Sequence, residues 1–122
     1  AVPIACNNEH FGRAENILAP GSGKNMGDGW ETRRSRGKNF DWLILKCATE
    51  GKISKIQIDT HHFKGNYPSK CSLQATYLKG KIGSNTIVNN SKKWKLLLNK
   101  VKLYQNVLYL FLIKNQLFLV HF

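Results

Sequence analysis

Residues 27–36 hold the densest group of side chains in the sequence that could do chemistry. Two carboxylates, three guanidiniums and an indole stand there among glycines, and glycine lets a backbone turn and approach a ligand closely. A guanidinium is a planar fork of donors that matches a carboxylate with two hydrogen bonds. One interpretation is therefore a site for a small anionic, hydrogen-bonding substrate, and the alternative is a solvated turn whose charges pair with each other. The side chains concerned are Asp28, Trp30, Glu31, Arg33, Arg34 and Arg36.

A second group of polar side chains follows a predicted strand. Ile56 and Ile58 alternate with polar residues, as in a half-buried strand. If the extended backbone continues, Asp59 and His61 share the opposite face. Such a pair could act as general acid and base or supply two metal ligands, because histidine titrates near neutral pH and a carboxylate fixes its tautomer. The plainer alternative is that one of His61 and His62 caps the strand while the other is solvated.

The elements that would position these groups are mostly short strands. Apolar runs predict strands at residues 42–45, 56–60, 73–77, 86–88 and 94–98. The only predicted helix is at residues 11–18 and is ended by Pro20. Short strands between Gly, Asn and Pro turns indicate an all-β fold, an antiparallel β-sandwich or jelly roll. Because such folds place ligand sites in the loops at one end, we expect the two groups to meet there.

The formal charge of +12 over 122 residues does not indicate a nucleic-acid or membrane partner. All seven acidic residues lie at or before Asp59, and ten lysines stand beyond it without an arginine. We find no zinc-ligand spacing, aromatic platform motif or basic helix, so no nucleic-acid binding is expected. The apolar run at residues 107–113 is short for a membrane span and is followed by Lys114-Asn115-Gln116, so no membrane partner is expected. The length fits one domain with a sandwich-sized core.

The three cysteines, Cys6, Cys47 and Cys71, lie far apart with no paired spacing. Neither a disulfide framework nor a zinc site is indicated, which fits a reducing compartment. The N-terminal stretch lacks the basic start and the apolar core of a signal peptide. We therefore expect an intracellular protein, cytoplasmic or peroxisomal.

Several motifs in this order resemble the allantoicase family. Residues 26–36 read Met-Gly-Asp-Gly-Trp-Glu-Thr-Arg-Arg-Ser-Arg, and residues 58–66 read Ile-Asp-Thr-His-His-Phe-Lys-Gly-Asn. The other matching positions are His10-Phe11-Gly12, Asn16-Ile17-Leu18, Gly23-Lys24-Asn25, Asp41-Trp42, Gly51-Lys52-Ile53, Pro68, Cys71 and Ser72. The resemblance covers residues 8–78 well and residues 94–103 loosely. Allantoicases carry two such repeats, and this chain holds one, most similar to the second.

The resemblance implies a galactose-binding-like jelly roll and the hydrolysis of allantoate to ureidoglycolate and urea in purine (allantoin) catabolism. Arg33 and Arg34 would clamp the substrate carboxylate, and Asp59 with either histidine would activate water and protonate the departing urea nitrogen. The expected catalytic residues are Asp59, His61, His62 and Glu31, and the expected substrate-binding residues are Asp28, Trp30, Arg33, Arg34, Lys64 and Asn66. Trp30 fits a core aromatic better than a substrate platform. In the alternative, a divalent metal that generates hydroxide is held by Asp28, Glu31, Asp59 and His61, although no spacing indicates one.

The sequence beyond Leu103 departs from the family. We predict a jelly-roll repeat at residues 1–103 and an atypical apolar tail at residues 104–122, rich in Lys, Asn, Leu, Ile, Phe and Tyr. Missing closing strands would leave the jelly roll incomplete, and the uncharged residues 107–113 have the high β-propensity of an aggregating segment. A truncated, non-catalytic ligand-binding remnant is therefore the second functional interpretation. The expected partners are allantoate and a first allantoicase repeat in the full-length protein, and a homo-oligomer is compatible with the sequence.

Overall fold

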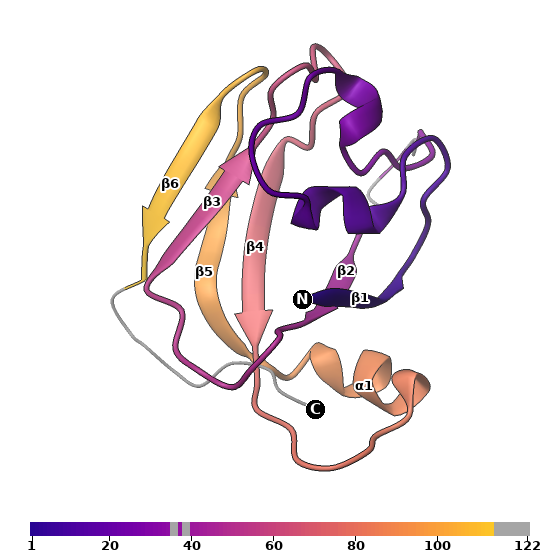
Figure 1. Ribbon diagram of the computed structural model, residues 1–122, viewed down its shortest axis with the longest axis vertical. Helices are drawn as coiled ribbons and strands as arrows, with labels where there is room; N and C mark the ends of the chain where they lie inside the picture. Colours follow the sequence, from indigo (N-terminus) through magenta and orange to yellow (C-terminus); the bar gives the residue numbers. More distant parts are fainter. Residues whose placement is uncertain (35–36, 38–39, 114–122) are drawn as a thin grey trace.

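The computed structural model describes residues 1–34, 37 and 40–113. Strands dominate, joined by two 3-10 turns and one α-helix (Figure 1). In chain order the elements are β1 (Val2–Cys6), η1 (Ala14–Leu18), η2 (Met26–Asp28), β2 (Leu43–Lys46), β3 (Lys55–Asp59), β4 (Lys70–Ala75), α1 (Ser84–Ser91), β5 (Lys95–Lys102) and β6 (Leu108–Leu112). This element list confirms the expected all-β class.

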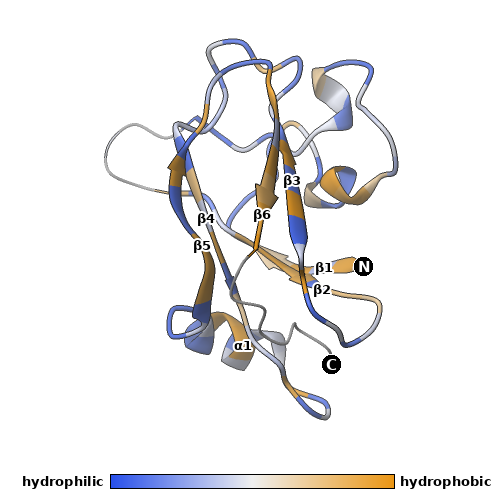
Figure 2. Ribbon diagram, turned by 90° about the vertical axis from the view of Figure 1, so that its left-hand side faces the viewer, coloured by the Kyte–Doolittle hydropathy of each residue, from blue (hydrophilic) through white to orange (hydrophobic). Residues whose placement is uncertain are grey.

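The strands pair in three antiparallel ladders, β1–β2, β3–β6 and β4–β5. Figure 2 shows β3–β6 and β4–β5 as two upright ladders, with β1–β2 at an angle to both. Burial alternates along β3 and β6 as the pleat requires. Ile56 lies opposite Phe111 and Ile58 opposite Tyr109, and all four side chains are half-buried on one face. The alternation predicted for β3 is therefore confirmed.

A small set of apolar side chains forms the core of the described residues. They are Ala14, Ile44, Ala75, Ile87, Leu103 and Ile113. Ala75 packs against the half-buried Ile53, Trp94 and Leu97. Leu103 is the largest of the fully buried side chains, at 1% exposure, and its backbone N–H donates to the Ser69 carbonyl at 2.9 Å. The end of β5 is thereby tied into the core.

Replacing Leu103 with alanine should lower the free energy of unfolding by about 2–5 kcal/mol, because the substitution removes buried methyl groups and leaves a cavity. Chemical denaturation followed by tryptophan fluorescence measures the change. Leu110→Ala is the matched control, since Leu110 is 63% exposed and surface substitutions usually stay within about 0.5 kcal/mol. Equal losses in the two variants would contradict the burial of Leu103.

The local patterns misplaced two elements. The strand predicted at residues 86–88 is wrong, since these residues lie in α1. Their β-branched side chains favour strands, but burial of Ile87 to 3% exposure outweighs this weak local preference. The predicted helix at residues 11–18 is only the short 3-10 turn η1. Strand β1 was not predicted, and its pairing with β2 is irregular between Pro3 and Ala5, as expected for proline in an edge strand.

Part of the predicted apolar tail lies in the described region. Residues 108–112 form β6, which pairs antiparallel with β3, and Ile113 is buried. The outer face of β6 carries Leu108, Leu110 and Leu112 at 46%, 63% and 66% exposure. The remaining tail residues, 114–122, lie outside the described residues. The boundary at Leu103 stays a prediction.

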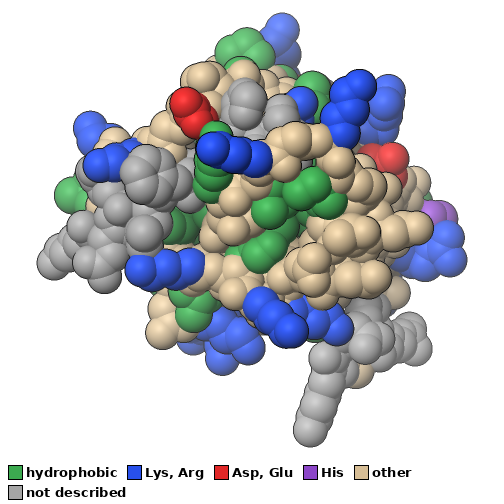
Figure 3. Space-filling view, turned by 90° about the horizontal axis from the view of Figure 1, so that it is seen from below, with side chains coloured by type: hydrophobic (Ala, Val, Ile, Leu, Met, Phe, Trp, Pro, Cys, Tyr) green, Lys and Arg blue, Asp and Glu red, His purple; other side chains and the backbone are tan. Residues whose placement is uncertain are grey.

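The surface at the lower end of the molecule mixes basic and apolar side chains. Figure 3, seen from below, shows Lys and Arg side chains spread around an apolar surface rather than gathered in one stripe. Within residues 1–34, 37 and 40–113, no helix has the length and apolar character needed to cross a bilayer.

Candidate functional site

The two polar groups predicted from the sequence meet at the upper end of the molecule. Figure 1 places the loop after β3 beside the two short helical turns there. The Asn66 side-chain amide lies 3.5 Å from Glu31 Oε1, and His62 Nε2 lies 2.8 Å from the Gly23 carbonyl oxygen. A Cβ on Gly29 would stand 2.8 Å from the Phe63 ring. The expectation that the two groups come together is confirmed by these contacts.

Asp59 and His61 form a carboxylate–imidazole pair. His61 Nδ1 lies 2.8 Å from Asp59 Oδ1, which also accepts the His61 backbone N–H at 2.8 Å. We expected continued extended backbone to place the two side chains on one face, but β3 ends at Asp59, so the pair arises in another way. A turn follows, closed by the Phe63 N–H donating to the Thr60 carbonyl at 3.1 Å. This turn folds His61 back onto the carboxylate.

The Asp59 contact sets the chemistry of His61. A carboxylate accepts hydrogen bonds, so Nδ1 of His61 carries the hydrogen and Nε2 of the neutral ring holds the lone pair. The His61 and Asp59 side chains are 40% and 33% exposed, so both reach solvent. A histidine oriented in this way can accept a proton at Nε2, and the carboxylate can stabilise the imidazolium that forms.

His62 presents its other ring nitrogen. Because a backbone carbonyl can only accept, its Nε2 carries the hydrogen donated to Gly23, and the lone pair of the neutral ring is on Nδ1. The two imidazole centroids lie 6.3 Å apart. The loop after β3 therefore offers two basic nitrogens in different orientations, and neither histidine is merely solvated.

Glu31 forms hydrogen bonds through both its backbone and its side chain. Its carbonyl accepts from the N–H groups of Phe11 and Gly12 at 3.1 and 3.4 Å, and its own N–H donates to the Gly12 carbonyl at 3.2 Å. The carboxylate accepts from Asn66, whose amide also contacts the Met26 sulfur at 2.9 Å. The backbone hydrogen bonds form an isolated antiparallel β-bridge between Gly12 and Glu31, which fixes the backbone of Glu31 next to the loop after β3.

The Gly12→Ala substitution should destabilise the fold and displace Glu31. A Cβ at this position would lie 2.3 Å from the Gly29 carbonyl oxygen and 3.2 Å from the Glu31 nitrogen, so backbone must move. We expect a loss of about 1–3 kcal/mol in the free energy of unfolding, as for other overpacked sites.

Gly51→Ala is the control for Gly12→Ala, since no atom lies within 4 Å of a Cβ built there. Chemical denaturation of both variants measures the difference. A Gly12→Ala variant as stable as the parent would show that the Gly12–Glu31 bridge can move without cost.

Asn8 connects the Trp30–Arg33 segment to the rest of the domain. Its carbonyl accepts from Trp30 Nε1 at 3.0 Å, and its Oδ1 accepts from the Arg33 backbone N–H at 2.7 Å. Its amide donates to Asp41 Oδ1 at 3.2 Å. Trp30 is half-buried, in keeping with a core aromatic rather than a platform.

The arginine side chains are available to a ligand. Arg33 and Arg34 are exposed, and Arg33 Nη2 lies 3.5 Å from His10 Nδ1. Within the described part of the chain neither arginine forms an ion pair with a carboxylate, so the alternative of mutually paired loop charges is wrong for these two residues. Arg36 lies outside the described residues.

The Asp28 side chain caps the start of η2. Its Oδ2 accepts from the backbone N–H groups of Lys24 and Asn25 at 2.7 and 3.4 Å, while Asn25 Oδ1 accepts from Gly27 N–H at 2.8 Å. The two side chains form a capping box at the start of η2. The Asp28 carboxylate thus shapes the loop.

The residues described do not gather a metal site. Among them, no three His, Cys, Asp or Glu side chains come together in a way that could hold an ion. The alternative in which Asp28, Glu31, Asp59 and His61 jointly bind one divalent metal is therefore wrong for this arrangement. Asp28 caps η2 and Glu31 binds Asn66, so their carboxylates serve separate partners.

Comparison with known proteins assigns the family. The family model described as "Allantoicase repeat" matches residues 1–122. The chain belongs to the allantoicase family. "Probable allantoicase 1" of Burkholderia mallei is 53% identical over 100 residues, 82% of this chain and 29% of that protein. "Probable allantoicase" of Photobacterium profundum is 48% identical over 100 residues, 82% of this chain and 30% of that protein.

Solved structures agree with this assignment. The crystal structure of allantoicase from Saccharomyces cerevisiae is 31% identical to the chain, with a TM-score of 0.80 over 97% of this chain and 33% of that one. The expected galactose-binding-like jelly roll of this allantoicase repeat is thereby confirmed. The chain spans about a third or less of the length of the relatives it matches.

Sequence reasoning missed the residues that hold the segment of Thr32, Arg33 and Arg34 in this allantoicase repeat. Asp41 accepts from the side chains of Asn7 at 2.6 Å, Asn8 at 3.2 Å and Thr32 at 2.7 Å. It thereby joins the end of β1 to the segment before β2. His10 and Asp41 both belong to motifs that match the allantoicase family. Arg33 lies 23 residues from His10 and Asn7 lies 34 residues from Asp41, and such spacing gives no local signal of a contact.

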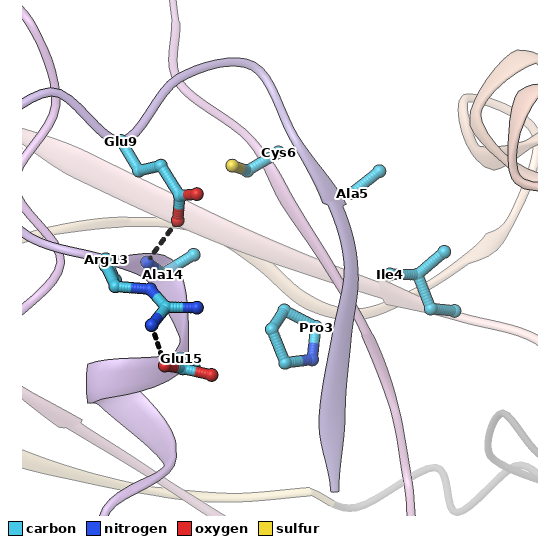
Figure 4. Close-up of a pocket in the computed structure, with 8 residues that line it drawn as sticks. All are labelled: Pro3, Ile4, Ala5, Cys6, Glu9, Arg13, Ala14 and Glu15. Carbon is cyan, nitrogen blue, oxygen red and sulfur yellow. Dashed lines mark hydrogen bonds and ion pairs between the residues drawn. The ribbon is translucent and has the colours of Figure 1, made fainter.

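A separate pocket of about 150 Å³ lies between β1 and the segment around η1 (Figure 4). None of the predicted site residues lines it. Burial, together with the charge of Glu9, raises the pKa of the Cys6 thiol, so the thiol stays protonated and is a poor nucleophile. Glu9 is engaged by the Ala14 N–H at 2.8 Å, and Arg13 pairs with Glu15 at 2.9 Å. The pocket therefore carries no independent catalytic group.

Proposed function

We propose that this repeat carries a site for the hydrolysis of allantoate to ureidoglycolate and urea. The observation that carries the proposal is the 2.8 Å pair between Asp59 and His61, at the start of the loop after β3, which contacts Glu31 through Asn66. The relatives of the chain are named allantoicases. Because the chain spans only 29–33% of their lengths, the activity of the whole protein is attributed to it as a proposal.

The reaction replaces one ureido group on the central carbon of allantoate by a hydroxyl group. His61 accepts the proton of the attacking water at Nε2, and Asp59 stabilises the resulting imidazolium. The new C–O bond forms as the C–N bond breaks, and the departing urea nitrogen takes a proton from the His61 imidazolium or from protonated His62, which then regains a proton from the His61 imidazolium through solvent. One water is consumed, and one urea is released.

The other polar groups proposed for the site suit the substrate. Arg33 and Arg34 are proposed to bind its carboxylate, since a guanidinium matches a carboxylate with two hydrogen bonds. Glu31 and Asn66 offer an acceptor and an amide to the planar urea groups. Trp30, Asp28 and the exposed Lys64 complete the proposed binding set, with Asp28 acting mainly through the loop that it caps.

A second candidate function is ligand binding without turnover by a truncated remnant. It is favoured by the exposed leucines of β6, which leave one face of this strand uncovered. Urea release from allantoate, measured together with ureidoglycolate, supports the hydrolase. Saturable heat of allantoate binding without product would support the remnant.

The partners follow from the same proposal. Allantoate is the proposed substrate, and a first allantoicase repeat is the proposed partner in the full-length protein. The absence of nucleic-acid and membrane partners, homo-oligomer formation, and a cytoplasmic or peroxisomal location stay predictions.

A further inference from the structure

His62 adopts a backbone conformation that is unusual for a side chain of its kind. It is the third residue of the turn from Thr60 to Phe63 and has a φ of 69°. This place in a turn is normally taken by glycine or asparagine, because a Cβ is strained there. Strained backbone that a structure nevertheless maintains often marks a functional position. The residues that stabilise this conformation of His62 are therefore relevant to the proposed site.

Asn106, 44 residues further along the chain, binds the backbone of His62. Its Oδ1 accepts the His62 backbone N–H at 3.0 Å, and its own N–H donates to the Thr60 carbonyl at 3.1 Å. Asn106 is itself left-handed, with a φ of 55°. Within the described ranges, His62 and Asn106 are the two non-glycine residues with positive φ, and they are bonded to each other.

The buried Thr60 also joins the loop after β3 to the turn at residues 104–107. It is 3% exposed, and its hydroxyl donates to the Tyr104 carbonyl at 2.7 Å and accepts from Val107 N–H at 3.0 Å. Its backbone N–H donates to the Val107 carbonyl at 2.9 Å. The turn at residues 104–107 is thus joined to the histidine loop by side-chain and backbone bonds on both sides of Asn106.

We propose that Asn106 is a positioning residue of the site. By accepting the His62 N–H it keeps His62 left-handed, which directs Nε2 to the Gly23 carbonyl and leaves Nδ1 as the basic nitrogen. The role in proton transfer rests on the proposed function, whereas the orientation of the ring does not. The turn at residues 104–107, beyond the predicted repeat boundary at Leu103, then belongs to the site.

Two substitutions separate the backbone from the side chain of Asn106. Asn106→Gly permits the left-handed backbone but removes the acceptor oxygen. Asn106→Asp retains an acceptor and tolerates the same conformation. Gln105→Ala is the control, because Gln105 is an exposed neighbour on the same turn.

The readout is the ¹⁵N pattern of the histidine rings in the full 122-residue chain, which distinguishes the two tautomers without any turnover. We expect the parent, Asn106→Asp and Gln105→Ala to show His62 with its hydrogen on Nε2. In Asn106→Gly the His62 pattern should move to the average of exchanging tautomers, while His61 keeps its hydrogen on Nδ1 through Asp59. In a form that releases urea, kcat should fall about 10- to 100-fold with KM little changed, as for a misplaced catalytic group.

An unchanged His62 pattern in Asn106→Gly would overturn the proposal. It would be overturned equally if folded Asn106→Asp lost the parent pattern, and this variant decides the matter if Asn106→Gly fails to fold. A chain that never acts on allantoate but shows the expected ring patterns would refute the proposed function alone. Parent-like kinetics in Asn106→Gly with an altered His62 pattern would overturn the link to catalysis.

Discussion

Replacing Asp59 with asparagine is expected to lower kcat/KM for urea release from allantoate by about 100- to 10,000-fold, the usual contribution of a positioned acid or base. The parent carboxylate accepts His61 Nδ1–H at 2.8 Å and can stabilise the imidazolium that forms when Nε2 takes a proton. Asparagine keeps the shape but loses the charge, and its NH₂ group favours the other tautomer of His61. Initial rates of urea release across pH measure the loss.

A matched control separates this effect from a general change of charge. Glu15→Gln removes a carboxylate paired with Arg13 at 2.9 Å on exposed side chains, and such surface pairs contribute less than about 1 kcal/mol. We expect Glu15→Gln to retain the parent rate and stability. If Asp59→Asn retained at least half of the parent kcat/KM while remaining folded, Asp59 would have no part in proton transfer.

The isolated chain is expected to release urea far more slowly than the ordinary enzymatic rate of roughly 10 per second. It spans only 29–33% of the length of its relatives, and β6 exposes three leucines at 46–66%. A catalytic constellation must be held within about half an ångström by the scaffold behind it, and a stability of about 5–15 kcal/mol does not readily absorb uncovered apolar faces. We also expect poor solubility.

Completing the scaffold should restore the rate. A version that carries the second-repeat ending of a relative after Leu103, with Asn106 retained at its place in the turn, and is joined to a first repeat should turn over at least about 100-fold faster, comparable to the loss from misplacing a reacting group by about 1 Å. Introducing Asp59→Asn into this fusion is the control, since the gain must then disappear if it depends on the site of this chain. An isolated chain that works at roughly 10 per second would contradict the argument.

Local patterns in the sequence were sufficient for the features that depend on neighbours in the chain. The alternation of Ile56 and Ile58 predicts β3, because period-2 burial is a local property of a pleated strand. Asp59 and His61 stand two residues apart, so a turn at the strand end is enough to bring their side chains together. The ordered motifs at residues 26–36 and 58–66 indicate the family without any tertiary contact.

Tertiary structure alone decided which distant groups hold these residues. Asn8 anchors Arg33 across 25 residues, and Thr60 and His62 bind the turn at residues 104–107 across 44–47 residues. Spacing of this size leaves no periodic signal, and hydrogen bonds between loops depend on how the strands pack. The helix α1 was mistaken for a strand for a related reason, since burial of Ile87 contributes more free energy than the β-propensity of a three-residue run.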